Sequence, residues 1–180
     1  MVSLIRPRAS SRGFTLVELL VVLVILGSLV GLAVLGVSDP RGRQLRDEAE
    51  RLSGLLALLS EAALLDNREY GLLVNDQGYR VQWYDEASAA WQDSREYRQH
   101  RLPASLRLQL QVEGQALQLA SAVTEEAPDN PLPAPQLLLL SSGELSSFSL
   151  QLQGREPGVA AWELRSDGFQ LPIAQRLEQR

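Results

Sequence analysis

The pattern of apolar and polar positions divides the chain into stretches of different character. A short polar leader, residues 1–13, precedes an apolar run that carries no charge from Leu19 to Val37. At about 1.5 Å per residue, a helix of that length spans about 28 Å, close to the hydrocarbon thickness of a bilayer. The pattern therefore predicts a transmembrane helix over residues 14–37.

A second helix, amphipathic this time, is expected over residues 38–66. Asp39 suits an N-cap, and Pro40 suits the first helical turn. Apolar residues then recur every three or four positions, which places them on one face of a helix. This stripe comprises Leu45, Ala49, Leu52, Leu56, Leu59 and Ala63. We expect the helix to continue the stalk and to end near Asp66.

From residue 67 to residue 180 the pattern changes to short strands separated by turns. Strict alternation over Leu106–Val112 indicates a strand with one buried face, and Asn75–Gly78 and Glu113-Gly114 read as hairpin turns. The expected strands are Tyr70–Val74, Tyr79–Tyr84, Leu106–Val112, Ala116–Ala120, Gln136–Leu140, Phe148–Leu152, Ala161–Arg165 and Phe169–Leu171. Together with the amphipathic helix, which can cover their apolar face, they predict an α+β fold with antiparallel sheet.

The N-terminal region admits three interpretations. The first is a secretory signal that is cleaved near the end of the apolar run. The second is a signal anchor that is not cleaved. The third is a leader that is removed at the Gly13–Phe14 junction, so that the apolar run is retained. The apolar run is longer than the 7–15 residues, roughly, of an ordinary signal. Arginines do not fix the orientation, because three precede the run and three follow it closely.

The hexapeptide Gly13-Phe14-Thr15-Leu16-Val17-Glu18 resembles the processing site of type IV prepilins and type II secretion pseudopilins. The resemblance implies that a prepilin peptidase cuts after Gly13, that Phe14 is N-methylated, and that the apolar helix is kept as anchor and filament core. It also implies that Glu18 docks subunits by meeting the α-amine of a neighbouring subunit.

Physical chemistry gives the glutamate at this place a rationale. An isolated carboxylate at the bilayer centre costs about 2.5–3.5 kcal/mol on insertion scales. Cleavage would create an ammonium group on Phe14, one helical turn before Glu18, and a paired carboxylate costs far less than a lone one. Gly27 and Gly31, four residues apart in the same run, permit close packing between helices.

The remainder of the chain is similar to the H-type minor pseudopilin of type II secretion, through segments such as NREYGLLV, GYRVQWYDEASAAWQD and LLLLSSGELSSFSLQL. The resemblance implies a type IV pilin-like fold, in which a long N-terminal helix packs on antiparallel sheet. It implies a single-pass inner-membrane protein whose domain over residues 67–180 lies in the periplasm. The implied partners are other minor pseudopilins, the major pseudopilin and the inner-membrane secretion platform.

Two alternatives stay open at this point: a minor pilin of a type IV pilus, and a periplasmic binding or enzymatic domain on a signal anchor. Against an enzyme, the sequence offers no cofactor motif, no cysteine and a single histidine, His100, which we expect at the surface among arginines. The three tryptophans, Trp83, Trp91 and Trp162, are expected on the core or a sheet face. The net charge of −5 becomes more negative still without the leader, which argues against nucleic-acid binding.

One acidic, proline-rich stretch, Thr124 to Pro135, cannot lie inside a sheet and is expected to form an exposed connector. Glu125, Glu126, Asp129 and Asn130 within it offer oxygen atoms. Calcium, however, needs 6–8 converging oxygens, roughly, and the stretch lacks an EF-hand spacing. The sequence therefore favours a solvated loop over a metal site, and no metal or cofactor is expected.

Overall fold

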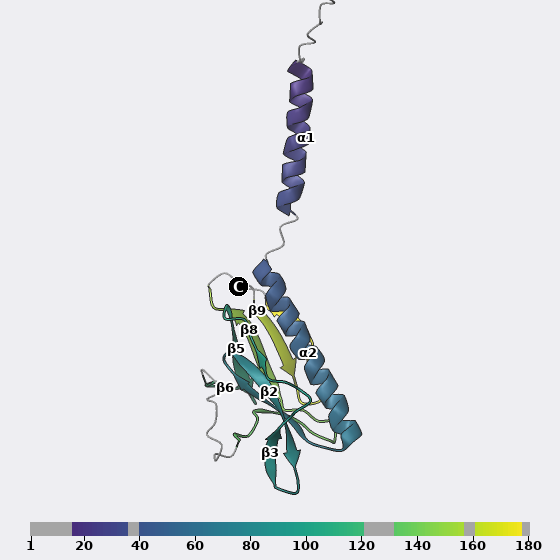
Figure 1. Ribbon diagram of the computed structural model, residues 1–180, viewed down its shortest axis with the longest axis vertical. Coiled ribbons are helices and arrows are strands. Elements are labelled where there is room, and N and C mark those ends of the chain that lie inside the picture. The colour runs from purple at the N-terminus through teal and green to yellow at the C-terminus, as the bar shows by residue number, and fades with distance from the viewer. Residues whose placement is uncertain (1–15, 36–39, 121–131, 157–160, 178–180) are drawn as a thin grey trace, which may run out of the picture. The chain divides into compact units, whose positions relative to one another are not determined.

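The computed structural model describes residues 16–35, 40–120, 132–156 and 161–177, with the side chains of 29–35, 40 and 41 excepted. The chain forms two compact units, residues 1–38 and residues 39–180, each of which is described by itself. The first unit contains one helix, α1 (Leu16–Leu35). It is continuous across the apolar run (Figure 1), as the sequence predicts; residues 14, 15, 36 and 37 lie outside the described part.

The second unit begins with the amphipathic helix α2 (Pro40–Asp66). Pro40 is its first residue, as expected, while the predicted cap, Asp39, lies outside the described residues. The helix ends where predicted because Asn67 takes a left-handed conformation with φ 47°. The amide of Arg68 then donates to the carbonyl oxygen of Ala63 at 3.2 Å, which satisfies one of the last helical carbonyls.

The strands form two antiparallel sheets. The first sheet has the order β3-β2-β1-β7, and β4 pairs with β2 beside this path. Its strands are β1 (Tyr70–Asn75), β2 (Gly78–Asp85), β3 (Ala90–Asp93), β4 (His100–Arg101) and β7 (Leu137–Leu139). The β1–β2 hairpin has the predicted position, and its turn is closed by the amide of Gln77, which donates to Asn75 Oδ1 at 2.8 Å.

The second sheet has the order β10-β9-β8-β5-β6. Its strands are β5 (Leu106–Val112), β6 (Gln115–Leu117), β8 (Phe148–Gly154), β9 (Ala161–Ser166) and β10 (Ala174–Leu177). The β5–β6 hairpin turns at Glu113 and Gly114, whose φ angles of 51° and 77° are those of a tight two-residue hairpin turn. The alternation read in the sequence of β5 is its alternation of buried and exposed side chains.

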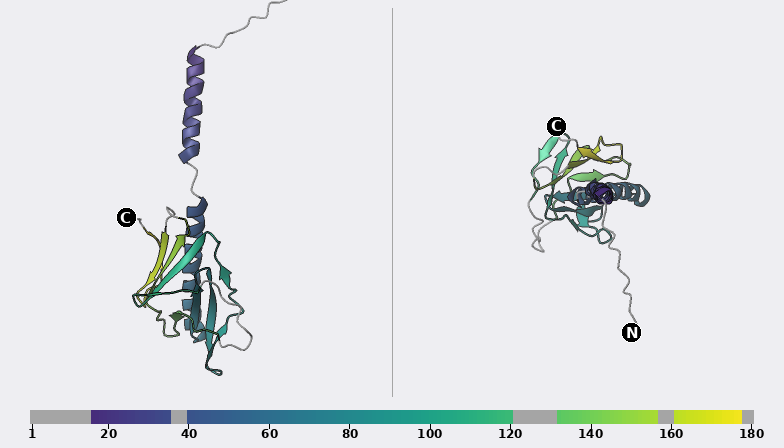
Figure 2. Two further views of the ribbon diagram at one scale, coloured as in Figure 1. Left: turned by 90° about the vertical axis from the view of Figure 1, so that its left-hand side faces the viewer. Right: turned by 90° about the horizontal axis from the view of Figure 1, so that it is seen from above.

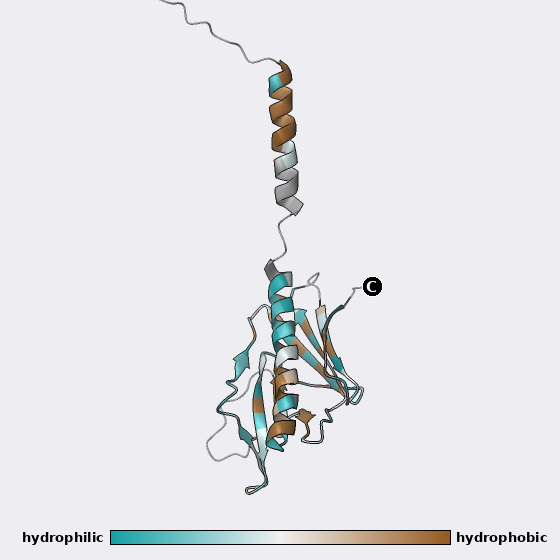
Figure 3. Cartoon of the chain, turned by 90° about the vertical axis from the view of Figure 1, so that its right-hand side faces the viewer, coloured by the Kyte–Doolittle hydropathy of each residue, from teal (hydrophilic) through white to brown (hydrophobic). Residues whose placement is uncertain are grey.

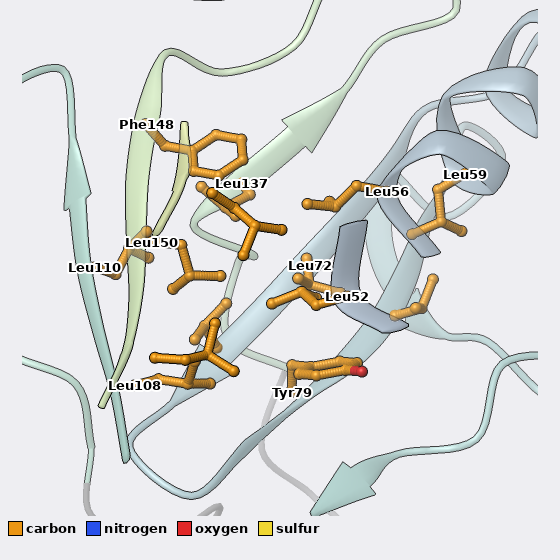
Figure 4. Close-up of a cluster of buried hydrophobic side chains, with 14 of the residues drawn as sticks. Leu52, Leu56, Leu59, Leu72, Tyr79, Leu108, Leu110, Leu137, Phe148 and Leu150 are labelled. Atoms are coloured by element: carbon orange, nitrogen blue, oxygen red, sulfur yellow. The ribbon is translucent and has the colours of Figure 1, made fainter. Parts of the chain in front are cut away.

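Helix α2 packs against both sheets and supplies the centre of the core (Figures 2 and 4). It contacts β8, β9 and β10 of the second sheet and β1 and β7 of the first. Every residue of the predicted stripe is completely buried, and Figure 4 shows Leu52, Leu56 and Leu59 directed toward leucines of the strands. Because the stripe is buried on two sheets at once, α2 holds the unit together.

Three details of the predicted strands are wrong. Phe169–Leu171 is not a strand: the carboxylate of Asp167 accepts hydrogen bonds from the amides of Phe169 and Gln170 at 3.0 Å each, which forms a turn. The last strand, β10, comes after Pro172 instead. β6 ends at Leu117 rather than at residue 120. β7 and β8 flank the segment SSGELSS, as expected, and belong to different sheets. The sequence analysis also missed β3 and β4.

Candidate functional site

The residues that the sequence analysis assigned to processing and assembly all belong to the N-terminal unit. Glu18 lies in the first turn of α1, among apolar neighbours on the helix surface. A carboxylate in the first turn of a helix is stabilised by the positive end of the helix dipole. Gly13 and Phe14 lie outside the described residues.

The first half of helix α1 is apolar apart from Glu18, as its colouring in Figure 3 shows, and its large apolar side chains are all exposed within this chain. The exposed side chains are Leu16, Val17, Leu19, Leu20, Val21, Val22, Leu23, Val24, Ile25 and Leu26. An amphipathic helix would bury one stripe against its own domain, whereas a helix that is apolar all round is buried in a larger core or in a membrane. Over the residues that the structure describes, no helix is long and apolar enough to cross a membrane.

The two glycines predicted to pack helices both fall within α1. A Cβ atom built on Gly27 would meet nothing within 4 Å, so the surface of the helix at this point is open to a close neighbour. The adjacent Ser28 does not compete for a partner, because its hydroxyl donates to the carbonyl oxygen of Val24 at 2.9 Å. At Gly27, therefore, no described side chain of this chain covers the helix surface.

The globular unit also exposes apolar side chains, and the sequence analysis did not single these out. In the segment before β10, Phe169 and Ile173 are largely exposed and Leu171 is about half exposed. A hydrogen bond joins this segment to α2, because the hydroxyl of Ser53 donates to the carbonyl oxygen of Pro172 at 2.7 Å. In the sequence these three apolar residues alternate with other residues. Such alternation is equally typical of a strand, so it did not reveal an exposed apolar surface.

His100 is not the free surface residue that the sequence suggested. Its Nε2 atom lies 2.7 Å from Oε2 of Glu48 on α2, and the two side chains are only 23% and 14% exposed. The imidazole also lies against the ring of Tyr79, with 5.1 Å between the ring centroids. His100 thus joins β4 to α2 and has a structural role at their contact.

The far end of α2 meets the first sheet through a cluster of aromatic and charged side chains. The hydroxyl of Tyr70 donates to Asp66 Oδ2 at 2.8 Å, and burial together with this bond raises the pKa of Tyr70 to about 12. The guanidinium of Arg68 lies over the ring of Trp83, 4.3 Å from its centroid. Trp83 and Trp162 are half-buried against the core, as expected for sheet-face residues.

Within the described residues, no group of three or more His, Asp or Glu side chains is arranged to hold a metal ion. The acidic residues weighed as calcium ligands, Glu125, Glu126, Asp129 and Asn130, lie outside the described residues.

Two family models match this chain. Residues 8–37 match the prokaryotic N-terminal methylation motif, and residues 48–168 match the type II transport protein GspH. The type II secretion system protein H of Pseudomonas aeruginosa is 49% identical over 168 residues, which cover 91% of this chain and 95% of that protein. The protein H of Aeromonas hydrophila is 30% identical over 157 residues, covering 84% and 86% of the two chains.

Solved structures share the fold. The minor pseudopilin EpsH from the type 2 secretion system of Vibrio cholerae has a TM-score of 0.55 at 23% identity, covering 74% of this chain and 95% of that one. The solution structure of Escherichia coli GspH gives a TM-score of 0.55 at 21% identity, covering 78% and 93%.

An apolar N-terminal helix that carries the methylation motif, followed by a helix packed on antiparallel sheet, defines the class of type IV pilin-like subunits. Within this class the chain belongs to the type II transport protein GspH family, whose members are H-type minor pseudopilins of type II secretion. The predicted fold class and family are thereby confirmed.

Proposed function

We propose that this chain is a structural subunit of the type II secretion pseudopilus, anchored in the inner membrane with its globular unit in the periplasm. The observation that carries the proposal is the succession of two matches on one chain, the methylation motif over residues 8–37 and the GspH model over residues 48–168. The first supports a retained apolar helix, and the second supports a periplasmic domain of the H type.

Processing is proposed to occur between Gly13 and Phe14, followed by methylation of the new N-terminus. The motif match spans this junction. Removing residues 1–13 takes three arginines off the end of α1. An apolar helix that begins within a few residues of its N-terminus can then slide out of the bilayer along a filament axis without dragging a charged leader.

Glu18 is proposed to dock the subunit onto its neighbours. In the assembled pseudopilus its carboxylate would meet the α-amine of Phe14 on an adjacent subunit. A charge pair in an apolar setting is strongly favoured over either charge alone, so each subunit would enter at one axial position. Gly27 and Gly31 would let neighbouring α1 helices approach closely enough for this pairing, since no side chain separates their backbones there.

The proposed partners follow from this assembly. They are other minor pseudopilins, the major pseudopilin, the inner-membrane platform and, during processing, the prepilin peptidase. The chain itself would catalyse nothing: its work is to occupy a place in a filament whose growth drives folded proteins through the outer membrane. The ATP that this needs would be hydrolysed by a separate cytoplasmic protein.

The first experiment is the intact mass and N-terminal sequence of the full chain from its native membranes. We expect a chain that begins at N-methylated Phe14. A chain that begins at Met1 would point to a simple signal anchor, and one that begins near Val37 to a secreted protein; either contradicts the proposal. A Gly13→Val variant should stay unprocessed, whereas Glu18→Gln should be processed normally and fail to support secretion.

The Glu18→Gln comparison isolates docking from processing. Glutamine keeps the size and polarity of the side chain and removes only the charge, so a secretion defect with normal processing would assign the defect to assembly. Gly54→Ala, in an exposed position of α2 where a Cβ meets nothing within 4 Å, serves as the control. Full secretion by an unprocessed Gly13→Val chain would contradict the proposal.

A further inference from the structure

A cavity of about 440 Å³ opens in the globular unit beside the turn of the β1–β2 hairpin. Its walls come from three separate parts of the chain: that turn, the segment from Gln99 through β4 to Leu106, and the residue after β8. Gln77, Arg101 and Arg155 represent these three parts.

The charged side chains that line the cavity are basic, and one carboxylate, that of Asp76, lies beside them. Its charged lining residues are two arginines, Arg101 and Arg155, whereas the whole chain carries a net charge of −5. The amide side chains of Asn75, Gln77 and Gln99 add polar groups that donate hydrogen bonds as well as accept them. Lining residues of this kind favour a ligand that carries negative charge.

Both arginine side chains have N–H groups that are available to donate hydrogen bonds to a ligand. The structure shows no ion-pair or hydrogen-bond partner for the Arg101 side chain among the residues it describes. Arg155 donates through Nε to the carbonyl oxygen of Leu106 at 3.2 Å, and its Nη2 lies 3.6 Å from Oδ2 of Asp76, too far for a good hydrogen bond. Asp76 offsets one positive charge, which leaves the cavity one net positive charge.

The arginine-bearing walls are fixed in place before any ligand arrives. Arg101 lies opposite Gly78 in the β2–β4 pairing, and there the backbones are so close that a Cβ on Gly78 would come within 2.2 Å of the carbonyl oxygen of His100. The amide of Leu102 donates to the carbonyl oxygen of Gln77 at 2.8 Å, and that of Arg155 donates to Ser105 at 2.8 Å. A preorganised site loses less entropy on binding.

The floor of the cavity is partly apolar, since Leu102, Pro103 and Leu106 also line it. An inorganic anion would leave these groups in contact with water. A glutamate or aspartate in a peptide would place its carboxylate on the arginines and its methylene groups and neighbours on the floor. We propose that this cavity binds an acidic segment of a partner protein, with Arg101 and Arg155 holding one carboxylate.

The test uses the full chain in detergent micelles and a capped peptide, Ala-Glu-Leu-Glu-Ala. Binding is followed by calorimetry and by backbone amide chemical shifts, with a matched Ala-Gln-Leu-Gln-Ala peptide and inorganic phosphate as competing probes. We expect the glutamate peptide to bind, with shifts centred on Gln77 and Leu102. Arg101→Gln should weaken binding at least about tenfold, because a charge-assisted hydrogen bond is lost.

Arg176→Gln is the charge-matched control, since Arg176 is exposed on β10 and lines no part of this cavity. It should change the affinity less than about twofold. Equal weakening by Arg101→Gln and Arg176→Gln would show unspecific attraction and overturn the proposal. Equal affinity for phosphate, equal affinity for the glutamine peptide, or no detectable binding would overturn it as well. Each of these outcomes leaves the proposed role in the pseudopilus as it stands.

Discussion

Nε2 of His100 lies 2.7 Å from Oε2 of Glu48, and this contact joins strand β4 to helix α2 across 52 residues of sequence. β4 is only two residues long and pairs only with Gly78 and Tyr79 of β2. So short a strand gains little stability from its backbone hydrogen bonds to β2. The side-chain contact to α2 therefore adds to the backbone hydrogen bonds that hold β4, which forms part of one wall of the arginine-lined cavity.

Replacing Glu48 with glutamine should destabilise the globular unit. The half-buried imidazole would lose a charged acceptor, and such hydrogen bonds contribute about 1.5–3 kcal/mol. We expect the free energy of unfolding to fall by about 1–3 kcal/mol in urea titrations of the full chain. A double-mutant cycle with His100→Gln should give a coupling energy of about 1 kcal/mol between the two side chains.

The exposed pair of Arg46 and Glu50 on the same helix provides the control. These side chains lie 2.6 Å apart at i and i+4, but both are more than half exposed. Solvent screens such a pair, so Glu50→Gln should leave the unfolding midpoint unchanged within error. Equal destabilisation by the two variants would contradict the structural role assigned to His100.

Two leucines of α2 should respond very differently to truncation. Leu56 is completely buried between the sheets, so Leu56→Ala removes buried methyl groups and leaves a cavity; we expect a loss of about 2–5 kcal/mol. Leu58 is 50% exposed, so Leu58→Ala should change the stability by less than about 0.5 kcal/mol. Urea unfolding of both variants checks the prediction, and similar losses would mean that α2 is packed on another face.

Two glycines should respond to alanine with opposite signs. Gly54 is exposed within α2, and its added Cβ meets nothing within 4 Å, so Gly54→Ala should stabilise by about 0.4–1 kcal/mol through a less flexible unfolded chain. Gly78→Ala would force a Cβ within 2.2 Å of a backbone oxygen, so we expect about 1–3 kcal/mol of destabilisation. Thermal unfolding measures both, and a stabilising Gly78→Ala would contradict the close β2–β4 approach.

Acid should weaken the turn that precedes β10. Hydrogen bonds from the backbone amides of Gln170 and Phe169 hold the pKa of Asp167 below its ordinary value. A carboxylate with a depressed pKa in the folded state contributes stability above its unfolded pKa, about 3.9, and loses that contribution as the pH falls through the folded value. The unfolding midpoint of the native chain should therefore drop between pH 6 and pH 3.

Asparagine at position 167 separates this titration from the hydrogen bonds. The amide oxygen of Asp167→Asn can still accept from the two backbone amides but does not titrate. We expect the variant to lose less stability than the native chain between pH 6 and pH 3, as followed by thermal unfolding at each pH. An identical loss in both chains would assign the acid sensitivity to other carboxyl groups.

Much of the architecture could be predicted from local patterns. The spacing of the α2 stripe predicted residues that are all completely buried, because a helix that must cover a sheet can bury only one face. The β1–β2 and β5–β6 hairpins were predicted because their turns are short and local. The hexapeptide from Gly13 to Glu18 indicated the family through residue types at fixed offsets, which need no tertiary context.

Tertiary structure alone decided how the strands are shared between two sheets and which side chains meet. Leu137–Leu139 joins β1 rather than the strand that follows it, because pairing partners far apart in sequence are chosen by packing against α2. The residues Phe169–Leu171 alternate like a strand, yet the hydrogen bonds of Asp167 bend them into a turn. Only the folded chain brings His100 into contact with Glu48 and places Arg101 and Arg155 in the lining of the same cavity. Periodicity encodes which face of an element is apolar; it carries no information on which distant element covers that face.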